Sequence, residues 1–195
     1  AMTRSSIDQG WLFLIAGPSG AGKDSVMAGA VARLRATMPI ELVQRVITRP
    51  PEPDGERNFE VSEAEFERLR VAGEFLLDWE AHGLLYAIPR SILPHIEAGQ
   101  ILLANVSRTR LMAGLAAYPN SATVIVEASK AVRAERLAAR GREDRLNQNA
   151  RVARHVDDVP VDLRIQNDSS LDEAVHRLCQ FIIERVAGGA PVSPP

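Results

Sequence analysis

The 195-residue sequence predicts an α/β fold in which helices cover both faces of a parallel sheet. Short uninterrupted apolar runs alternate with segments whose apolar residues recur every three or four positions, a pattern typical of buried parallel strands joined by helices. A glycine-rich stretch stands at the first junction between a strand and a helix. The alternation is interrupted between residues 45 and 98, which predicts a small lobe inserted into a single domain whose core comprises residues 11–44 and 99–187.

Composition narrows the class of protein. A hydrophobic fraction of 46% is sufficient for a buried core, and a net charge of −2 provides no general attraction to nucleic acid or anionic membranes, so we expect neither as a partner. No apolar run approaches the length of a membrane span, the start lacks a signal-peptide pattern, and the single cysteine, Cys179, suits a reducing compartment, so we expect a cytoplasmic protein. Residues 188–195 should form a flexible tail, and the oligomeric state stays open, a homodimer included.

The glycine-rich stretch has the pattern Gly17-x4-Gly22-Lys23, between an apolar run over residues 12–16 and a helical pattern. Glycines let backbone N–H groups approach an anion, a helix N-terminus favours negative charge, and the lysine can reach the β- and γ-phosphates of a nucleotide. The alternative is a turn that only links strand to helix, but the elements on either side favour phosphate binding. The nucleotide-binding residues expected here are Gly17, Pro18, Ser19, Gly20, Ala21, Gly22, Lys23, Asp24 and Ser25, with Lys23 also catalytic.

One position departs from the usual phosphate-binding loop, or P-loop. The lysine is normally followed by serine or threonine, whose hydroxyl binds Mg²⁺, whereas this chain has Asp24 and then Ser25. Because a carboxylate is a good ligand for Mg²⁺, we hypothesise that Asp24 binds the metal directly or through water. The alternative is that Asp24 only complements the helix N-terminus.

A strand predicted over residues 41–47 leads from the core into the inserted lobe and ends at Thr48 and Arg49. At a strand end on the ligand-binding edge of the sheet, these two side chains suit a second, acceptor phosphate. The alternative is a turn cap followed by a solvent-exposed arginine. Farther along, Ser62 and Glu65 form a capping box that opens a helix.

Other lobe residues are weaker candidates for the acceptor site. Asp78 should point away from the adjacent Trp79 on an extended segment, and it could bind hydroxyl groups or be solvated. His82 and Tyr86 flank a turn, where a histidine is often only a hydrogen bonder and the tyrosine could be part of the core. A helix over residues 91–98 should end the lobe.

The second half of the chain returns to alternating strands and helices. An arginine-rich stretch follows its second helix, and residues 140–154 suit a lid over ATP in which Arg140 and Arg151 contact phosphates and act in catalysis. The alternative is a solvated helix face. The predicted strands are 101–106, 123–127 and 162–166, and the predicted helices are 107–117, 130–140 and 171–186, the last capped by residues 167–169.

Together these motifs resemble the guanylate kinase family. The segments that carry the resemblance, in the family's order over almost the whole chain, are Gly17 to Lys23, Thr48-Arg49-x-Pro51, Phe75 to Tyr86, Arg136 to Gly141 with Arg151, and Asn167-Asp168. The resemblance implies a P-loop core, a lobe for the phosphate acceptor and an arginine-rich lid. It also implies that Arg140 and Arg151 contact the phosphates of ATP and that Asn167 contacts its adenine.

The acceptor lobe departs from that of true guanylate kinases. Glu52 stands where those enzymes carry a second phosphate-binding arginine, Asp78 replaces a guanine-reading glutamate, and Ile88 replaces a hydroxyl that contacts guanine. At the end of a core strand, Asn105 and Ser107 replace an Asp-x-Asp pair. A site without these base-reading groups disfavours guanine.

The departures are similar to those of ribose 1,5-bisphosphate phosphokinases, guanylate-kinase-like enzymes of phosphonate breakdown. The similar segments are Gly22 to Ser25, Val46 to Pro50, Trp79 to Pro89 and Arg140 to Glu143. This resemblance implies Mg²⁺-dependent transfer of the γ-phosphoryl group of ATP to the 1-phosphate of ribose 1,5-bisphosphate, which gives 5-phosphoribosyl 1-diphosphate and ADP.

The resemblance also implies how charge is distributed. Because Asn105 lacks the charge of a strand-end aspartate and Asp24 adds one, we hypothesise that the carboxylate has moved from the strand to the loop. Two alternatives stay open: a nucleoside monophosphate kinase with unusual base recognition, and a kinase-like binding module without turnover, against which the intact loop argues. The expected substrate-binding residues are Thr48, Arg49, Asp78, His82, Tyr86, Asn105, Ser107 and Arg108.

Overall fold

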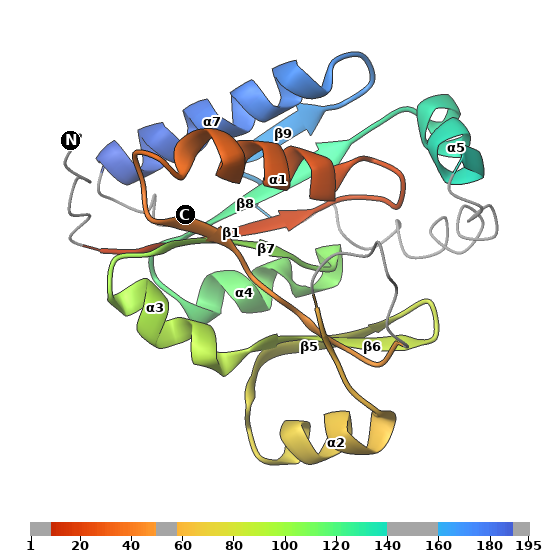
Figure 1. Cartoon of the computed structure of the whole chain (residues 1–195), viewed down its shortest axis with the longest axis vertical. Coiled ribbons are helices and arrows are strands. Elements are labelled where there is room, and N and C mark those ends of the chain that lie inside the picture. The colour runs from red at the N-terminus through yellow and green to blue at the C-terminus, as the bar shows by residue number, and fades with distance from the viewer. Residues whose placement is uncertain (1–8, 50–57, 140–159, 189–195) are drawn as a thin grey trace.

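The computed structural model of the chain describes residues 9–49, 58–139 and 160–188, which contain two β-sheets (Figure 1). The five-stranded core sheet has the order β2-β7-β1-β8-β9, and the four-stranded lobe sheet has the order β4-β3-β6-β5. The core strands are β1 (Trp11–Ala16), β2 (Ile40–Leu42), β7 (Ile101–Asn105), β8 (Ser121–Glu127) and β9 (Leu163–Gln166). The lobe strands are β3 (Val46–Ile47), β4 (Phe59–Glu60), β5 (Phe75–Ala81) and β6 (Leu84–Pro89).

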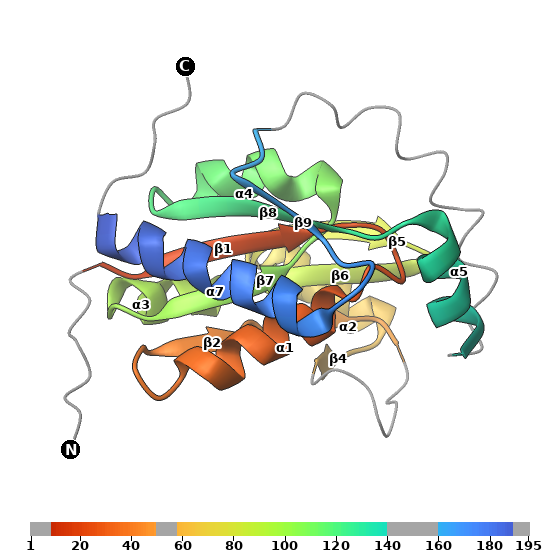
Figure 2. The same ribbon diagram turned by 90° about the horizontal axis from the view of Figure 1, so that it is seen from above.

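Helices cover both faces of the core sheet, as predicted. Helices α1 (Lys23–Leu34) and α7 (Leu171–Gly188) pack together on one face, while α3 (Leu93–Glu97) and α4 (Leu111–Ala117) lie on the other, toward the lobe sheet (Figures 1 and 2). Two short 3₁₀ helices, η1 (Arg90–Ile92) and η2 (Arg108–Arg110), precede α3 and α4. Helix α5 (Lys130–Ala139) lies beyond the end of the core sheet, and α2 (Glu63–Val71) covers the outer face of the lobe sheet.

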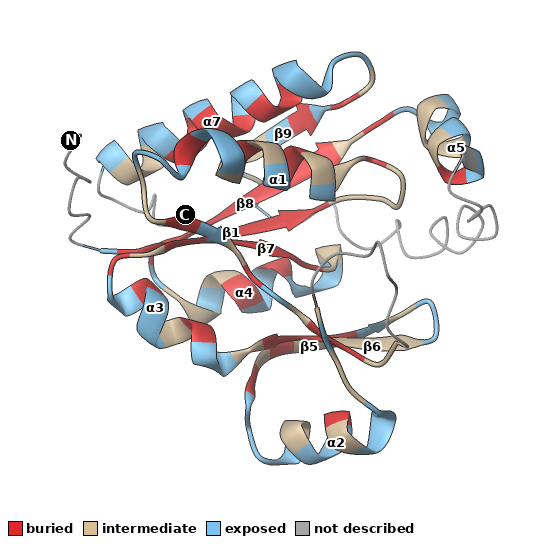
Figure 3. Cartoon of the chain, in the orientation of Figure 1, coloured by how far each residue is buried: buried red, intermediate tan, exposed pale blue. Residues whose placement is uncertain are grey.

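The central strand β1 pairs in parallel with β7 and β8, and all six of its residues are buried (Figure 3). Because side chains alternate along a strand, Phe13 and Ile15 join the hydrophobic cluster under α1 and α7, whereas Leu12 and Leu14 join the cluster between the core sheet and the lobe sheet. The uninterrupted apolar run therefore reflects burial on both faces, as the sequence predicts.

The single strand predicted over residues 41–47 is wrong, because the structure divides this segment between the two sheets. Strand β2 pairs in parallel with β7, and the N–H group of Val43 donates to the carbonyl of Leu103 as the last bond to the core sheet. Val46 then pairs with Ala87 in the antiparallel register of the lobe sheet. A continuous apolar pattern indicates a strand but does not indicate a change of pairing partner. The sequence alone therefore could not predict that this segment passes from one sheet to the other.

The lobe is a hairpin covered by α2. The β5–β6 hairpin turns at His82 and Gly83, whose φ angles of 55° and 70° match a type I′ turn. On the outer face, the fully buried Phe66 of α2 packs on Phe75, with ring centroids 4.7 Å apart. The predicted helix start at Ser62 is confirmed, since the hydroxyl of Ser62 accepts a hydrogen bond from the N–H group of Glu65. The return bond of a full capping box is not formed, because both carboxylate oxygens of Glu65 accept from Arg68 instead.

Two further boundaries differ from the prediction. The segment 107–117 begins as η2 before α4, and the cap of α7 is Ser170, whose hydroxyl accepts from the N–H group of Glu173, instead of residues 167–169. The predicted lid over 140–154 and residues 189–195 of the predicted tail lie outside the described residues. None of the helices in the described ranges combines the length and apolarity that a membrane crossing needs.

Replacing Phe66 by alanine should destabilise the lobe by about 3 kcal/mol, because it removes the one fully buried side chain of α2 from its contact with Phe75. The free energy of unfolding in denaturant measures the effect. Val71→Ala is the matched control on the same helix, since Val71 is 81% exposed and should change stability by less than about 0.5 kcal/mol. Equal losses in the two variants would contradict this account of the lobe.

Candidate active site

The glycine-rich loop lies at the carboxyl edge of the core sheet, between β1 and α1. A side chain at Gly17 would place its Cβ 2.0 Å from the carbonyl oxygen of Val126 on β8, and φ of Gly17 is 151°. Gly22, with φ of 83°, would place a Cβ 2.5 Å from Nδ2 of Asn167. The loop is thus pressed against its neighbours at two points, and only glycine fits either position.

Lys23 begins α1 and folds back over the loop. Its Nζ donates to the carbonyl oxygen of Gly17 at 2.9 Å and to that of Pro18 at 3.2 Å. The residue before it, Gly22, provides no side-chain cap for the helix. Backbone N–H groups of the first helical turn and a mobile ammonium group therefore meet at one place, which is the arrangement expected for an anion site.

The back of the loop is fixed by two side chains from the second half of the chain. Nδ2 of Asn167 donates to the carbonyl oxygen of Ala21 at 2.8 Å, and Nη1 of Arg136 approaches the same oxygen at 3.5 Å. Asn167 is only 2% exposed, and its Oδ1 accepts no hydrogen bond from the part of the chain that the structure describes. The structure therefore brings Asn167 to the back of the glycine-rich loop.

Asp168 positions α5 beside this loop (Figure 2). Its Oδ1 accepts from the N–H group of Ser129 at 2.6 Å, and its Oδ2 accepts from Nε2 of Gln166 at 2.5 Å. The hydrogen bond from the Ser129 backbone, then the Gln166 amide and the charge of Arg136, lower the pKa of the Asp168 carboxyl. Because the folded pKa is depressed, the stabilising effect of this ionised group is present above its unfolded pKa and is lost as pH falls through the lower folded value.

Asp24 and Asn105 are brought together from the two elements named in the hypothesis. Nδ2 of Asn105, at the end of β7, donates to Oδ1 of Asp24, in the first turn of α1, at 2.6 Å. Asn105 is 7% exposed, whereas Asp24 is exposed. The carboxylate of Asp24 therefore lies beside the end of β7. This is the geometry required by the hypothesis that the carboxylate has moved from the strand to the loop.

The same edge carries Arg108 and Glu127. Nη2 of Arg108 lies 3.5 Å from Oε1 of Glu127, and Nη1 of Arg164 on β9 lies 3.1 Å from the same oxygen. Ser107, the residue before η2, shares a 3.0 Å hydrogen bond between its hydroxyl and that of Thr109. The motifs of the sequence do not point to Glu127, although its position at the end of a buried strand is a signal that could have identified it.

Thr48 has a structural role in the lobe sheet. Its hydroxyl accepts from the N–H group of Leu85 at 2.9 Å, and its own N–H group donates to the Leu85 carbonyl at 3.1 Å. These two bonds extend the pairing of β3 with β6 by one residue and favour the turn-cap alternative for Thr48. They also fix the backbone that leads to the partly buried Arg49.

Tyr86 is part of an aromatic stack on the lobe sheet. Its ring lies 5.6 Å from that of Trp79 with an interplanar angle of 7°, and Cζ of Arg45 lies 5.4 Å from the Tyr86 centroid. Trp79 is 5% exposed and packs in the hydrophobic cluster that the lobe shares with the core sheet. Arg45 was not among the residues expected from the sequence.

Two expected substrate-binding residues lie apart from this stack. Asp78 occupies the other face of the lobe sheet, where its Oδ1 accepts from Nη2 of Arg70 on α2 at 3.1 Å, so the geometry does not support its expected contact with the acceptor. His82 lies at the exposed tip of the hairpin. Arg140 and Arg151, expected to contact the donor phosphates, lie outside the described residues.

Comparison with known proteins relates the chain to one group of enzymes, although no family model matches the sequence. The ribose 1,5-bisphosphate phosphokinase PhnN of Desulfomicrobium baculatum is 40% identical over 181 residues, which cover 91% of this chain and 97% of that protein. The protein of the same name from Chelativorans sp. is 41% identical over 185 residues, 93% of this chain and 88% of the relative. A bifunctional ribose 1,5-bisphosphokinase-thymidine phosphorylase of Cupriavidus necator is 40% identical over 176 residues, which make up 89% of this chain and 29% of that protein.

Solved structures support the fold. The guanylate kinase of Anaplasma phagocytophilum superposes with a TM-score of 0.68, covering 90% of this chain and 86% of its own, at 19% sequence identity. At that identity the structural similarity supports the fold alone, a P-loop architecture with an inserted lobe.

Replacing Gly22 by alanine should weaken the binding of Mg·ATP by tenfold or more, because the new Cβ would meet Asn167 at 2.5 Å and would be strained at φ of 83°. Calorimetric titration measures the affinity. Gly73→Ala is the matched control, since Gly73 has φ of 73° with nothing within 4 Å, so it tests backbone strain alone and should leave ATP binding unchanged. Unaltered ATP affinity in Gly22→Ala would contradict this account of the loop.

Proposed function

Because this chain belongs to the family of ribose 1,5-bisphosphate phosphokinases, we propose that it transfers the γ-phosphoryl group of ATP to the 1-phosphate of ribose 1,5-bisphosphate. The bond between the γ-phosphorus and the β,γ-bridging oxygen breaks, a new bond forms to an oxygen of the 1-phosphate, and the products are ADP and 5-phospho-α-D-ribose 1-diphosphate. The observation that carries the proposal is the similarity to relatives of that name over almost the whole length of both chains. The reaction would serve phosphonate breakdown in the cytoplasm.

On the donor side, the glycine-rich loop would hold the triphosphate. The ammonium group of Lys23 now rests on the carbonyl oxygens of Gly17 and Pro18, and the β- and γ-phosphate oxygens would replace these acceptors when ATP binds. Asn167 would contact the adenine, which the buried acceptor Oδ1 supports. We further propose that Arg140 and Arg151 neutralise the charge that develops on the transferred group.

On the acceptor side, the protein must position the acceptor phosphate and compensate its negative charge, and it does not need a strong base. The attacking oxygen belongs to a phosphate that is already anionic, so no side chain needs to remove a proton from it. Arg49 on the lobe and Arg108 at the core edge would bring positive charge to this phosphate. The ionic contact of Arg108 with Glu127 holds the guanidinium at that edge.

The residues present fit a Mg²⁺ ion. Phosphoryl-transfer enzymes bind Mg²⁺ through one or two protein ligands plus phosphates and water, so the exposed carboxylate of Asp24 beside the loop is a sufficient protein ligand. Bound Mg²⁺ would neutralise the β- and γ-phosphates. Asn105 would orient the Asp24 carboxylate through its 2.6 Å hydrogen bond.

An acceptor assay tests the function. We expect rapid release of ADP from Mg·ATP with ribose 1,5-bisphosphate, and a kcat/KM for GMP about 10⁴-fold lower, because the lobe lacks the groups that pair with guanine. Rapid turnover with GMP alone would instead identify a nucleoside monophosphate kinase. Absence of ADP with every acceptor would favour a binding module.

Exchanging the carboxylate tests the metal role. Asp24→Asn should raise the Mg²⁺ concentration for half-maximal activity at least tenfold, and adding Asn105→Asp to that variant should restore part of the loss, because the charge returns to a neighbouring position. The Mg²⁺ dependence of the initial rate provides the measurement. If Asp24 only complements the helix N-terminus, Asp24→Asn lowers stability and leaves the Mg²⁺ dependence as it was.

A further inference from the structure

Tyr86 is the middle layer of a three-layer stack on the lobe sheet. The sheet order places β6 between β3 and β5, so Arg45, just before β3, approaches the ring from one side and Trp79 on β5 approaches it from the other. The nearly parallel Trp79 ring, 5% exposed, fixes the plane of Tyr86. The phenol ring thus orients a guanidinium at a defined place in the lobe.

The stack lies on the face of the lobe sheet that is turned toward the core sheet. Ile47 and Tyr86 are directly paired across β3 and β6, so their side chains share a face, and alternation places Arg45 on the same face as Ile47. Trp79 and Tyr86 pack in the hydrophobic cluster shared with the core sheet, whereas Val46 and Ala87 pack under α2 on the other face. Arg45 therefore belongs to the face on which an acceptor would meet the donor.

The charged groups on the core-facing side of the lobe sheet favour the binding of an anion beside Tyr86. The carboxylate of Asp78 is directed to the opposite face, where Arg70 binds it, so it does not oppose an anion beside Tyr86. The guanidinium of Arg45, held over the Tyr86 ring, is a planar fork of N–H donors, and such a fork matches two oxygens of a phosphate. The position of Arg45 on this face therefore favours a phosphate beside its guanidinium.

We propose that Arg45 binds the phosphate group of the acceptor that does not react, the 5-phosphate of ribose 1,5-bisphosphate. This inference rests on the proposed function, in which the acceptor carries two phosphates. Arg45 and Arg49 are four residues apart on an extended segment, so their Cα atoms are separated by about 13 Å. Two arginine side chains at that spacing can hold the two ends of one pentose bisphosphate.

The position of each arginine along the chain assigns the two phosphates. Arg45 follows the last core-sheet hydrogen bond, made by Val43, by two residues, and so stands where the chain passes from one sheet to the other. Arg49 lies beyond the last bond of β3 to β6, made by Thr48. Arg45 thus precedes β3, where the chain leaves the core sheet, and Arg49 follows the far end of β3. The family resemblance assigns Arg49 to the reacting phosphate.

Arg45→Gln tests the assignment with two half-substrates. Calorimetric titration should show that ribose 5-phosphate binds the variant about 100-fold more weakly than the wild type, while ribose 1-phosphate binds both equally, because only the former carries the phosphate that Arg45 would hold. The kcat/KM for ribose 1,5-bisphosphate should fall by a similar factor through KM. Arg45→Lys should lie between the two, since it keeps the charge and loses the planar fork.

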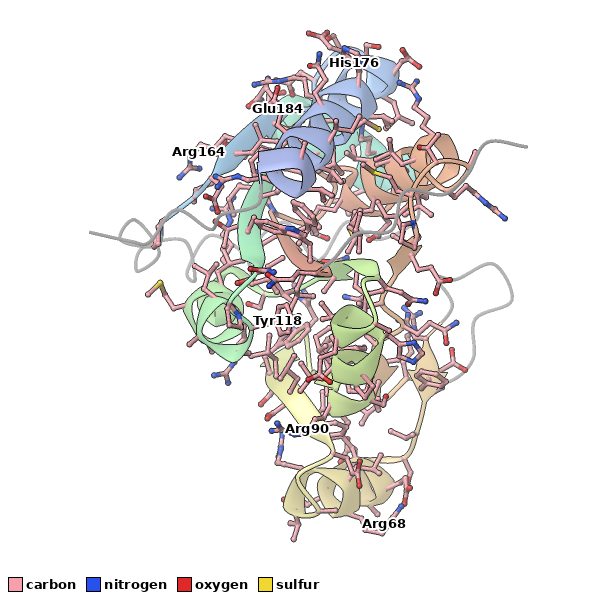
Figure 4. The ribbon with its side chains drawn as sticks, turned by 90° about the vertical axis from the view of Figure 1, so that its left-hand side faces the viewer. Arg68, Arg90, Tyr118, Arg164, His176 and Glu184 are labelled. Atoms are coloured by element: carbon pink, nitrogen blue, oxygen red, sulfur yellow. The ribbon has the colours of Figure 1, made fainter. Side chains whose placement is uncertain are left out.

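The control is Arg68→Gln, the same substitution on the exposed side of α2, where Arg68 is 65% exposed and pairs with Glu65 (Figure 4). It should change neither titration.

Equal losses for the two half-substrates in Arg45→Gln, or a wild type that does not bind ribose 5-phosphate, would overturn the assignment. If Arg45→Gln does not fold, as thermal unfolding would show, undiminished ribose 5-phosphate binding by Arg45→Lys overturns it instead. A wild type that turns over GMP and not ribose 1,5-bisphosphate would contradict the proposed function itself.

Discussion

The carbonyl oxygen of Ala21 is the point at which the phosphate-binding loop is fixed to the rest of the core. Asn167 donates to it at 2.8 Å from the turn after β9, and Arg136 approaches it from α5. The position of the loop therefore depends on contacts among three segments that lie far apart in the sequence. Gly17 and Gly22 make this attachment possible, because they let the loop lie against Val126 and Asn167 without a clash.

The lobe depends on a similar constraint, which is the change of sheet at residues 43–45. The chain leaves the core sheet after Val43 and joins the lobe sheet at Val46. Because Leu77, Trp79 and Leu102 belong to one hydrophobic cluster that spans both sheets, burial fixes where the lobe stands relative to the core. Packing thus fixes the position of the lobe sheet, and under the proposed function the side chains on one of its faces would recognise the acceptor.

Local chemistry made much of this structure predictable. The strand, loop and helix around Lys23, and the start of α2 at Ser62, follow from residue types acting on their immediate neighbours. The divided strand over 41–47 could not be predicted, since apolar residues are buried equally well in either sheet. The pairing of Asp78 with Arg70 depends on where α2 packs, and the contact of Glu127 with Arg164 depends on the placement of β9 beside β8. Such contacts between distant segments leave no periodic signal.

The stack of Trp79 on Tyr86 has a spectroscopic consequence. The chain contains two tryptophans, of which Trp11 stacks with Phe13 inside the core sheet and Trp79 stacks with Tyr86 in the lobe. Indole fluorescence responds to neighbouring rings and charges, so the two emitters sample the two parts of the molecule separately. With phenylalanine in place of Trp11, the remaining emission would report the state of the lobe alone, without any attached dye.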